Sequence, residues 1–355
     1  MSVIAVAAAG ARLPVTILTG FLGSGKTTVL AQLLKHPALA RTAIIINELG
    51  EVGLDHELVR IGGAGEAIVL PGGCVCCTIR SDLADTLREL FQKRVRGQVP
   101  DFERVVLETT GLADPAPILH TLIGDPITAA RYVADGVITT IDAYNAEWQL
   151  DVQREAVKQA AFADRILLTK TDLASPEVTA RLIERLHAIN PSAIPIPVLN
   201  GAIDPALIIG TGFAGKGAQI EAWLAAEAHA GHDHGGHHHG LDPHHHDDGI
   251  RSFCLSFDTP LEWDRVADAL DRLAEFGGGR LLRIKGILDI AGSDRPVVVH
   301  GIQHLFHPPA LLDAWPGPER TSRIVFITSG IERDAVDQTF RALLDGAPSG
   351  RVPAR

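Results

Sequence analysis

The stretch GFLGSGKTT, residues 20–28, carries residue types that can hold phosphate groups. It fits the pattern G-x-x-x-x-G-K-[ST], follows an apolar strand pattern and opens a helix pattern, which is the context that this motif needs. Glycines let backbone N–H groups converge on phosphate oxygens, and the N-terminus of a helix favours negative charge. The residues expected to contact a nucleotide in this loop are Gly20, Gly23, Ser24, Gly25, Lys26, Thr27 and Thr28.

A second stretch, RVVLETTG at residues 104–111, offers the acidic residue that such a loop needs near its Mg²⁺ ion. Glu108 ends an apolar strand pattern, and the backbone N–H of Gly111 follows where it can contact the γ-phosphate. In P-loop sites the lysine contacts the β- and γ-phosphates and the loop hydroxyl ligates Mg²⁺. We therefore expect Lys26, Thr27 and Glu108 to be catalytic, with Thr27 and Glu108 as the Mg²⁺ ligands.

A third stretch, TKTD at residues 169–172, is similar to the [NT]-K-x-D signature that reads guanine. The Asp172 carboxylate would accept hydrogen bonds from guanine N1–H and the exocyclic amine, which adenine cannot match, and the stem of Lys170 would lie against the ring. Most GTPases have Asn at the position of Thr169. Because Thr has a hydroxyl but no amide, we expect part of the usual bracing of the base pocket to be lost. A P-loop ATPase or kinase acting on a small molecule is the alternative.

Cys74, Cys76 and Cys77 lie within four positions in the stretch GGCVCC. Three thiols in a glycine-initiated loop can converge on one soft cation, and both Zn²⁺ and Co²⁺ accept tetrahedral sulfur ligands. A redox pair formed by Cys74 and Cys77, or a set of structural thiols, remains open. Cys254 fits a buried position on a strand.

The elements that must position these residues follow an alternating pattern. Short β-branched runs alternate with helix patterns, which predicts a doubly wound, mainly parallel sheet covered on both faces, the P-loop NTPase type of α/β fold. The predicted strands are residues 14–19, 42–47, 67–70, 104–109, 134–142, 164–170 and 193–200.

Composition changes abruptly at residues 228–249, which consist largely of His, Gly and Asp. Such a segment cannot bury a core, so we expect a flexible His-rich linker that can gather metal ions with little selectivity. After it, the order β-α-β-β-β-α predicts a small α+β domain. The predicted divisions are a P-loop GTPase domain at 1–225, the linker at 226–249, the α+β domain at 250–348 and a disordered tail at 349–355.

The overall composition excludes several classes of protein. The chain has 355 residues, 46% of them hydrophobic, and a formal net charge of −11, which argues against nucleic acid as a partner. No apolar run reaches the roughly 20 residues that a membrane-spanning helix needs. The start of the chain lacks a basic region typical of a signal peptide, and its four cysteines do not form a disulfide framework, so we expect a cytoplasmic protein.

Taken together, the motifs resemble those of the CobW-type GTPases, the metallochaperones related to the urease and hydrogenase nickel-insertion GTPases. The matching stretches span roughly residues 14–330 and are GFLGSGKTT, NELGEVGLD, LPGGCVCCT, ETTGLADP, TKTD and LLRIKG. Glu108 in place of the commoner Asp is a hallmark of that family. The resemblance implies GTP hydrolysis coupled to delivery of a transition metal, most often zinc and in some members cobalt, to a client protein. It also implies that Glu48 is a carboxylate partner of the cysteines.

These features lead to a mechanism in which GTP and Mg²⁺ order the segment around Glu48 and Gly111, and hydrolysis to GDP opens the metal site. No residue is an obvious general base, so intrinsic hydrolysis should be slow. We expect a monomer or a nucleotide-dependent dimer. A passive metal buffer with a vestigial nucleotide site is the other alternative, and the intact Lys26, Thr27 and Glu108 count against it.

Overall fold

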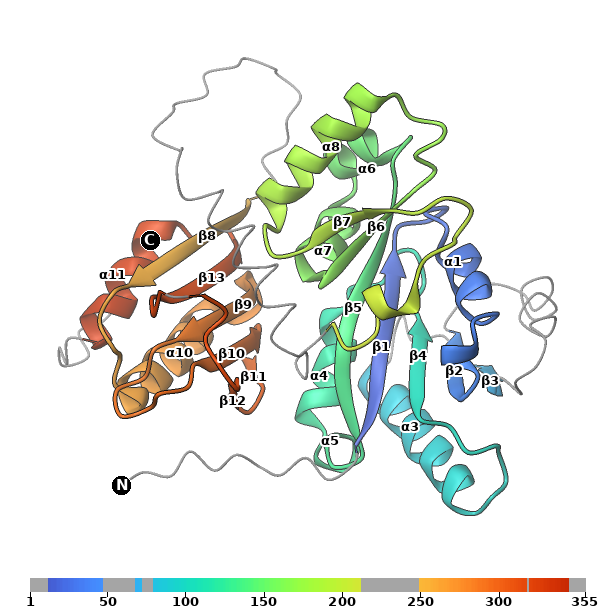
Figure 1. The fold of residues 1–355 in the computed structure, drawn as a ribbon, viewed down its shortest axis with the longest axis horizontal. Helices are drawn as coiled ribbons and strands as arrows, with labels where there is room; N and C mark the ends of the chain where they lie inside the picture. Colours follow the sequence, from blue (N-terminus) through green and yellow to red (C-terminus); the bar gives the residue numbers. More distant parts are fainter. Residues whose placement is uncertain (1–11, 47–67, 72–78, 212–248, 318, 345–355) are drawn as a thin grey trace. The chain divides into compact units, whose positions relative to one another are not determined.

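The computed structural model describes residues 12–46, 68–71, 79–211, 249–317 and 319–344. These residues belong to two compact units, each built around its own sheet (Figure 1). The predicted domain limits at 225 and 249 stay predictions, because they border or fall among residues outside the described ranges.

The first unit contains a seven-stranded sheet in the order β3-β2-β4-β1-β5-β6-β7, and all of its pairings are parallel. Its strands are β1 (Leu13–Gly20), β2 (Thr42–Ile46), β3 (Ile68–Pro71), β4 (Arg104–Glu108), β5 (Tyr132–Asp142), β6 (Arg165–Thr169) and β7 (Ile194–Pro197). The predicted doubly wound α/β fold is therefore confirmed, with a strand at each predicted position.

Helices connect these strands, as crossovers between parallel strands require. They are α1 (Lys26–Leu33), η1 (Pro37–Leu39), α3 (Ile79–Val95), α4 (Ala116–Gly124), α5 (Pro126–Ala129), α6 (Ala146–Val152), α7 (Arg154–Phe162) and α8 (Pro176–Ile189). A short helix, η2 (Pro205–Leu207), follows the last strand, β7. None of the helices in the described ranges is long and apolar enough to cross a membrane.

The central strand β1 is buried on both faces, which explains its nearly continuous apolar sequence. Successive side chains of a strand point to opposite faces, and Leu18 packs into a cluster with Leu30 and Leu33 of α1. On either side of β1 lie β4 and β5, so the direction of winding reverses there. In open α/β sheets ligands bind beyond the carboxyl ends of the strands at such a switch point, which is where the P-loop follows β1.

The second unit is an antiparallel sheet in the order β11-β10-β9-β13-β8, with β12 paired to β10. Its elements are β8 (Ile250–Phe257), α10 (Trp263–Gly277), η3 (Gly278–Arg280), β9 (Leu281–Leu288), β10 (Val297–Ile302), β11 (Leu305–Phe306), β12 (Ala310–Leu311), β13 (Ser322–Ser329) and α11 (Arg333–Leu344). The predicted β-α-β-β-β-α order is right except for β11 and β12, which are too short to produce a periodic pattern.

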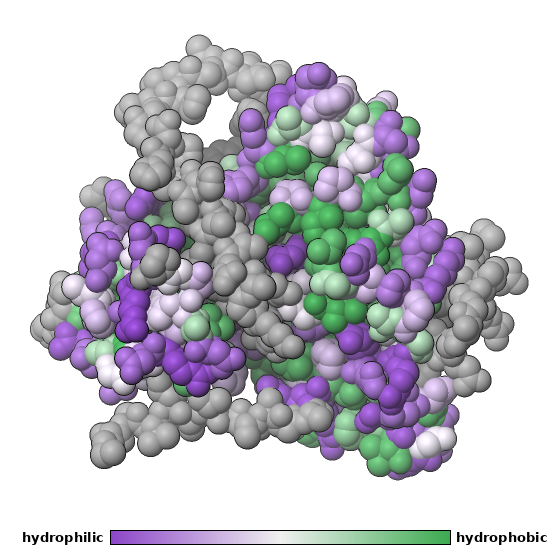
Figure 2. All heavy atoms as spheres, in the orientation of Figure 1, coloured by the Kyte–Doolittle hydropathy of each residue, from purple (hydrophilic) through white to green (hydrophobic). Residues whose placement is uncertain are grey.

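Surface hydropathy differs between the helices and the sheet of the first unit. Figure 2 shows hydrophobic side chains gathered over β5, β6 and β7, whereas the visible parts of α3 and α8 are mostly hydrophilic. The two helices therefore present solvated faces, as amphipathic helices on a buried sheet should.

Three aromatic rings pack together within the mostly aliphatic core of the second unit. The Phe340 ring on α11 is fully buried, with its centroid 6.1 Å from that of Phe326 and 5.7 Å from that of Phe257. Aromatic rings at such distances contribute beyond the area that they bury. Phe340 therefore joins α11 to both β13 and β8.

A Phe340→Ala substitution should lower the free energy of unfolding of the second unit by about 3–5 kcal/mol, because it leaves a cavity in this core. Urea denaturation of the full chain, followed by circular dichroism, measures the loss. The matched control is Phe276→Ala on α10, where the ring is 38% exposed. That control should change the free energy of unfolding by less than about 1 kcal/mol, and equal losses in the two variants would contradict the assignment of the core.

Candidate functional site

The loop after β1 leads directly into helix α1, whose first residue is Lys26. Gly25 precedes it with a φ of 91°, a left-handed conformation that glycine adopts without strain. Within the described residues no side chain caps this helix, and its first turn contains no acidic residue. The N–H groups of the first turn therefore remain available to an anion, which suits phosphate.

The Lys26 side chain lies over the loop and is only 7% exposed. Its Nζ atom donates to the carbonyl oxygens of Gly20 at 3.0 Å and Phe21 at 3.2 Å. The ammonium group is thus held against the backbone of the loop by two carbonyl oxygens.

Thr27 and Glu108 meet beside this loop. The Oγ1 atom of Thr27 donates to Oε1 of Glu108 at 2.7 Å, and Glu108 is completely buried. The pair forms because β4 lies parallel to β1 with Glu108 in register with Leu18. A hydroxyl and a carboxylate at one point are the hard oxygen donors that Mg²⁺ prefers, so these two residues fit the ion.

Gly111 lies against the P-loop. A Cβ atom added to Gly111 would come within 2.7 Å of the backbone nitrogen of Leu22. Only glycine permits this close approach, and the loop after β4 therefore contacts the loop after β1 through their backbones.

The residue at the Asn position of the base-reading motif also reaches the P-loop. Thr169 ends β6, and its Oγ1 atom donates to the carbonyl oxygen of Ser24 at 2.7 Å. Its Cγ2 methyl would lie 3.5 Å from a Cβ atom on Gly25. The expected loss of bracing is therefore limited, because the hydroxyl supports the loop from this side.

Lys170 is held in a left-handed conformation, with a φ of 56°. That conformation costs a non-glycine residue roughly 1–2 kcal/mol. The Nζ atom of Lys170 donates to Oδ2 of Asp142 at 2.8 Å, and the Asp142 side chain is 2% exposed. This ion pair offsets the strain and fixes the side chain of Lys170 against the end of β5.

Burial would raise the pKa of Asp142, but hydrogen bonds from Lys170, Asn145 and the backbone N–H of Tyr144 together lower it below its usual value. The carboxylate is therefore ionised at neutral pH and forms a stable anchor at the end of β5.

The remaining predicted residues lie around this cluster. Asp172 is exposed in the turn after Lys170, Thr28 is exposed on α1, and Gly23 is exposed with a φ of 73°. The structure thus brings the P-loop, Glu108, Gly111 and the TKTD segment together at the carboxyl ends of β1, β4 and β6.

Three features of the site were not anticipated from the sequence. Asp142 holds Lys170, Thr140 pairs with Ser24 through their hydroxyl oxygens at 2.6 Å, and the Asn200–Gly201 turn packs on the start of α1. Both residues of that turn have positive φ angles, 52° and 75°. The Asn-Gly dipeptide is the signal that could have found the turn.

The expected metal ligands Glu48, Cys74, Cys76 and Cys77 lie outside the described residues, as does the His-rich stretch 226–248. Within the described ranges no group of three or more His, Cys, Asp or Glu side chains could hold a metal ion. Cys254 lies on β8 as predicted, but it is half-buried, and its thiol contacts the carbonyl oxygen of Leu255 at 3.7 Å.

The fold and this cluster define a P-loop NTPase. Residues 14–197 match the CobW/HypB/UreG nucleotide-binding domain, and residues 250–344 match the cobalamin synthesis protein CobW C-terminal domain. The chain therefore belongs to the CobW/HypB/UreG family.

Its similarity to individual members covers nearly the whole chain. It is 34% identical to the zinc chaperone YjiA of Escherichia coli, over 93% of this chain and 98% of that protein. It is 31% identical to the zinc chaperone CobW of Pseudomonas aeruginosa, over 94% and 92%. The crystal structure of Zn(II)-bound YjiA GTPase from E. coli matches with a TM-score of 0.68 and 28% identity, covering 94% of this chain and 99% of that one.

An Asp142→Asn substitution should weaken the preference for GTP over ATP, because Lys170 loses the charge that holds it. Competition between the two nucleotides for the purified chain measures the preference, which should fall severalfold with the loss of one charge-assisted bond. Asp151→Asn on α6 removes a carboxylate outside the cluster and serves as the control.

The loss of stability caused by Asp142→Asn should depend on pH. Because the folded-state pKa of Asp142 is lowered, its contribution to stability is complete above the unfolded value of about 3.9 and is lost as the pH falls towards the folded value. The difference in melting temperature between wild type and Asp142→Asn should therefore be constant from pH 7 to 5 and shrink below pH 4. A difference that grows on acidification would contradict this assignment.

Proposed function

We propose that this chain binds GTP with Mg²⁺, hydrolyses it slowly, and couples the nucleotide state to holding and delivering a transition metal, in the first place zinc. The metal would be held by Cys74, Cys76 and Cys77 with Glu48, and it would pass to a client protein in the cytoplasm. Cobalt is the alternative cargo, because it accepts the same ligands.

The observation that carries the nucleotide part is the pair of hydrogen bonds that connect the P-loop to two neighbouring segments. Thr27 reaches Glu108 at the end of β4, and Thr169 at the end of β6 reaches Ser24. The groups proposed to bind phosphate, Mg²⁺ and the base are thereby joined in one cluster, as a GTP site needs. The names of the relatives, zinc chaperones and a zinc-regulated GTPase metalloprotein activator from Schizosaccharomyces pombe, support the same function.

The strand order supports a link between this cluster and the metal segments. β2 and β3 end at Ile46 and Pro71, which are paired in register, and Ile46 is also in register with Glu108. The chain therefore leaves β2 towards Glu48, and β3 towards Cys74, from the same edge of the sheet as the P-loop.

The protein's own groups would act mainly by positioning. Backbone N–H groups of the P-loop and Lys26 would bind the phosphates, and Thr27 and Glu108 would hold Mg²⁺, which supplies charge neutralisation when bound. The TKTD segment would select guanine. Because no residue among the described parts of the site is an obvious general base, turnover by the isolated chain should be slow.

Lys26→Ala should abolish GTP turnover, because it removes the positive charge held against the backbone of the loop. The matched control is Lys35→Ala, which removes the same charge just beyond the other end of α1. Phosphate release by each purified variant measures the effect. Retained turnover in Lys26→Ala would mean that the P-loop does not carry the reaction.

Zinc affinity should depend on the bound nucleotide. We expect the chain to bind zinc about tenfold more tightly with a non-hydrolysable GTP analogue than with GDP, within the range usual for coupled sites. A competing chelator measures both affinities, with the histidines of 228–249 replaced so that they do not mask the cysteine site. A variant lacking all three thiols should lose the difference, and equal affinities in the wild-type cysteine background would rule out the coupling.

A further inference from the structure

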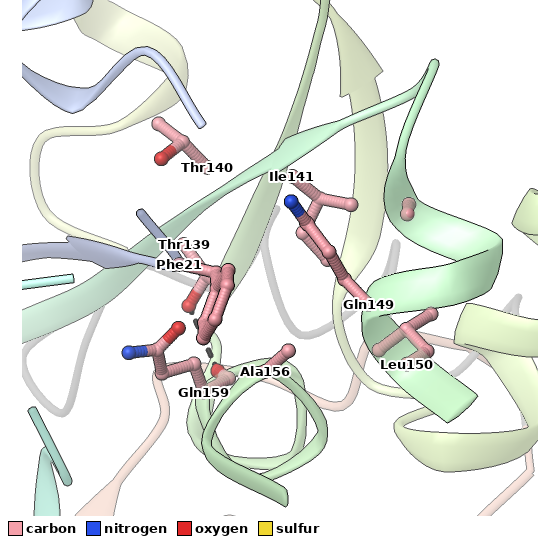
Figure 3. Close-up of a pocket in the computed structure, with 9 residues that line it drawn as sticks. Phe21, Thr139, Thr140, Ile141, Gln149, Leu150, Ala156 and Gln159 are labelled. Atoms are coloured by element: carbon pink, nitrogen blue, oxygen red, sulfur yellow. Dashed lines mark hydrogen bonds between the residues drawn. The ribbon is translucent and has the colours of Figure 1, made fainter. Parts of the chain in front are cut away.

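Gln159 connects helix α7 to the loop that follows Glu108. Its side chain is completely buried. The Nε2 atom donates to the carbonyl oxygen of Gly111 at 3.2 Å and to that of Ala113 at 3.0 Å. Figure 3 shows Gln159 beside Phe21 of the P-loop, in the pocket that both residues line.

These two bonds hold a tight turn. The N–H of Ala113 donates to the carbonyl oxygen of Thr110 at 3.2 Å. The C=O of Thr110 and the N–H of Gly111 belong to one trans peptide and point in opposite directions. Because the C=O of Thr110 points into the turn, the N–H of Gly111 is directed away from it. The same glycine lies against the backbone of Leu22 in the P-loop. The conformation of the turn therefore sets the direction of the N–H that we expect to contact a γ-phosphate.

Gln159 is itself anchored to the sheet. Its backbone carbonyl oxygen accepts from Oγ1 of Thr139 on β5 at 2.9 Å, a bond drawn in Figure 3. The preceding residue, Lys158, forms an ion pair with Asp114 of the same loop at 3.1 Å. Helix α7 thus fixes the loop to β5 at two successive residues.

Packing alone does not account for a glutamine at this position. Among the described residues its Oε1 atom is buried without a hydrogen-bond partner, which costs roughly 1–3 kcal/mol. The two carbonyl acceptors dictate which way the amide faces, because only the NH₂ group can donate to them. Methionine or leucine would fill the space without that cost, so the donated bonds are the reason for the amide.

We propose that Gln159 is a positioning residue for γ-phosphate recognition. It holds the carbonyl groups of Gly111 and Ala113 so that the Gly111 N–H faces the nucleotide, and it thereby sets the discrimination between GTP and GDP. This inference rests on the proposed GTP site, but it concerns only the γ-phosphate, which GDP lacks.

The test compares nucleotide affinities of Gln159→Met, which keeps the length of the side chain but cannot donate. Its affinity for GDP should stay within about twofold of wild type. Its affinity for a non-hydrolysable GTP analogue should fall about tenfold, as expected when the Gly111 N–H no longer donates a hydrogen bond to a charged γ-phosphate oxygen. Isothermal titration with the full chain and Mg²⁺ measures both. In turnover, the weaker binding of GTP should appear as a higher KM, with little change in inhibition by GDP.

The matched control is Gln149→Met on α6, which lines the same pocket and makes no side-chain hydrogen bond to the loop within the described residues. Figure 3 shows that the two glutamines come from different helices. Both affinities should be unchanged in this control. If Gln159→Met does not fold, Gln159→Leu, which is smaller, uncharged and likewise unable to donate, decides in the same assay.

The inference is overturned if the folded Gln159 variant keeps the wild-type ratio of the affinities for the GTP analogue and GDP. If both affinities fall equally, Gln159 has a structural role only. A wild-type chain that binds neither nucleotide overturns the proposed function and this inference with it. If the wild-type chain discriminates between the GTP analogue and GDP and Gln159→Met does so equally well, only the inference about Gln159 is overturned.

Discussion

The buried carboxylate of Glu108 is the group on which the rest of the first unit depends. A fully desolvated acidic side chain is tolerated only when polar partners compensate it, and the Thr27 hydroxyl is one of them. That bond requires β4 to lie beside β1 and in register with it, because a shift of one residue would turn the carboxylate to the other face. The register of the parallel strands therefore places the carboxylate of Glu108 at the N-terminus of helix α1.

The neighbouring segments are tied to the same point by short polar links. Thr169 supports the P-loop from β6, Asp142 holds Lys170 from β5, and Gln159 holds the loop beyond Glu108. All of these links involve ends of strands or helix α7, which precedes β6. The apolar strands supply the stability, and the polar groups at their ends supply the geometry, a division that is typical of open α/β sheets.

The fold of this unit could be predicted because runs rich in β-branched residues, which form the buried strands, alternate with amphipathic helix patterns along the sequence. The approach of Glu108 to the P-loop could also be predicted, because both lie in motifs with a fixed local spacing at the ends of strands. Asp142 and Gln159 were not, since each acts on a residue 28 or 48 positions away and looks locally like an ordinary strand end or a polar helix residue. In the second unit, β11 and β12 escaped prediction because two residues cannot show a period. The contribution of Thr169 was underestimated, because the reach of its hydroxyl depends on how close β6 lies to the loop.

The contact between Thr169 and the glycine before α1 has a consequence for how such sequences change over time. The hydroxyl of Thr169 bonds to Ser24, and its methyl group lies where a Cβ atom on Gly25 would just touch it, so the two motifs meet at one point. Another residue at 169 would have to reach Ser24 with a hydrogen-bond donor of its own. Chimeras that take the base-reading segment from a relative with Asn at this position would therefore need that relative's phosphate loop as well, and the two motifs are expected to be inherited together.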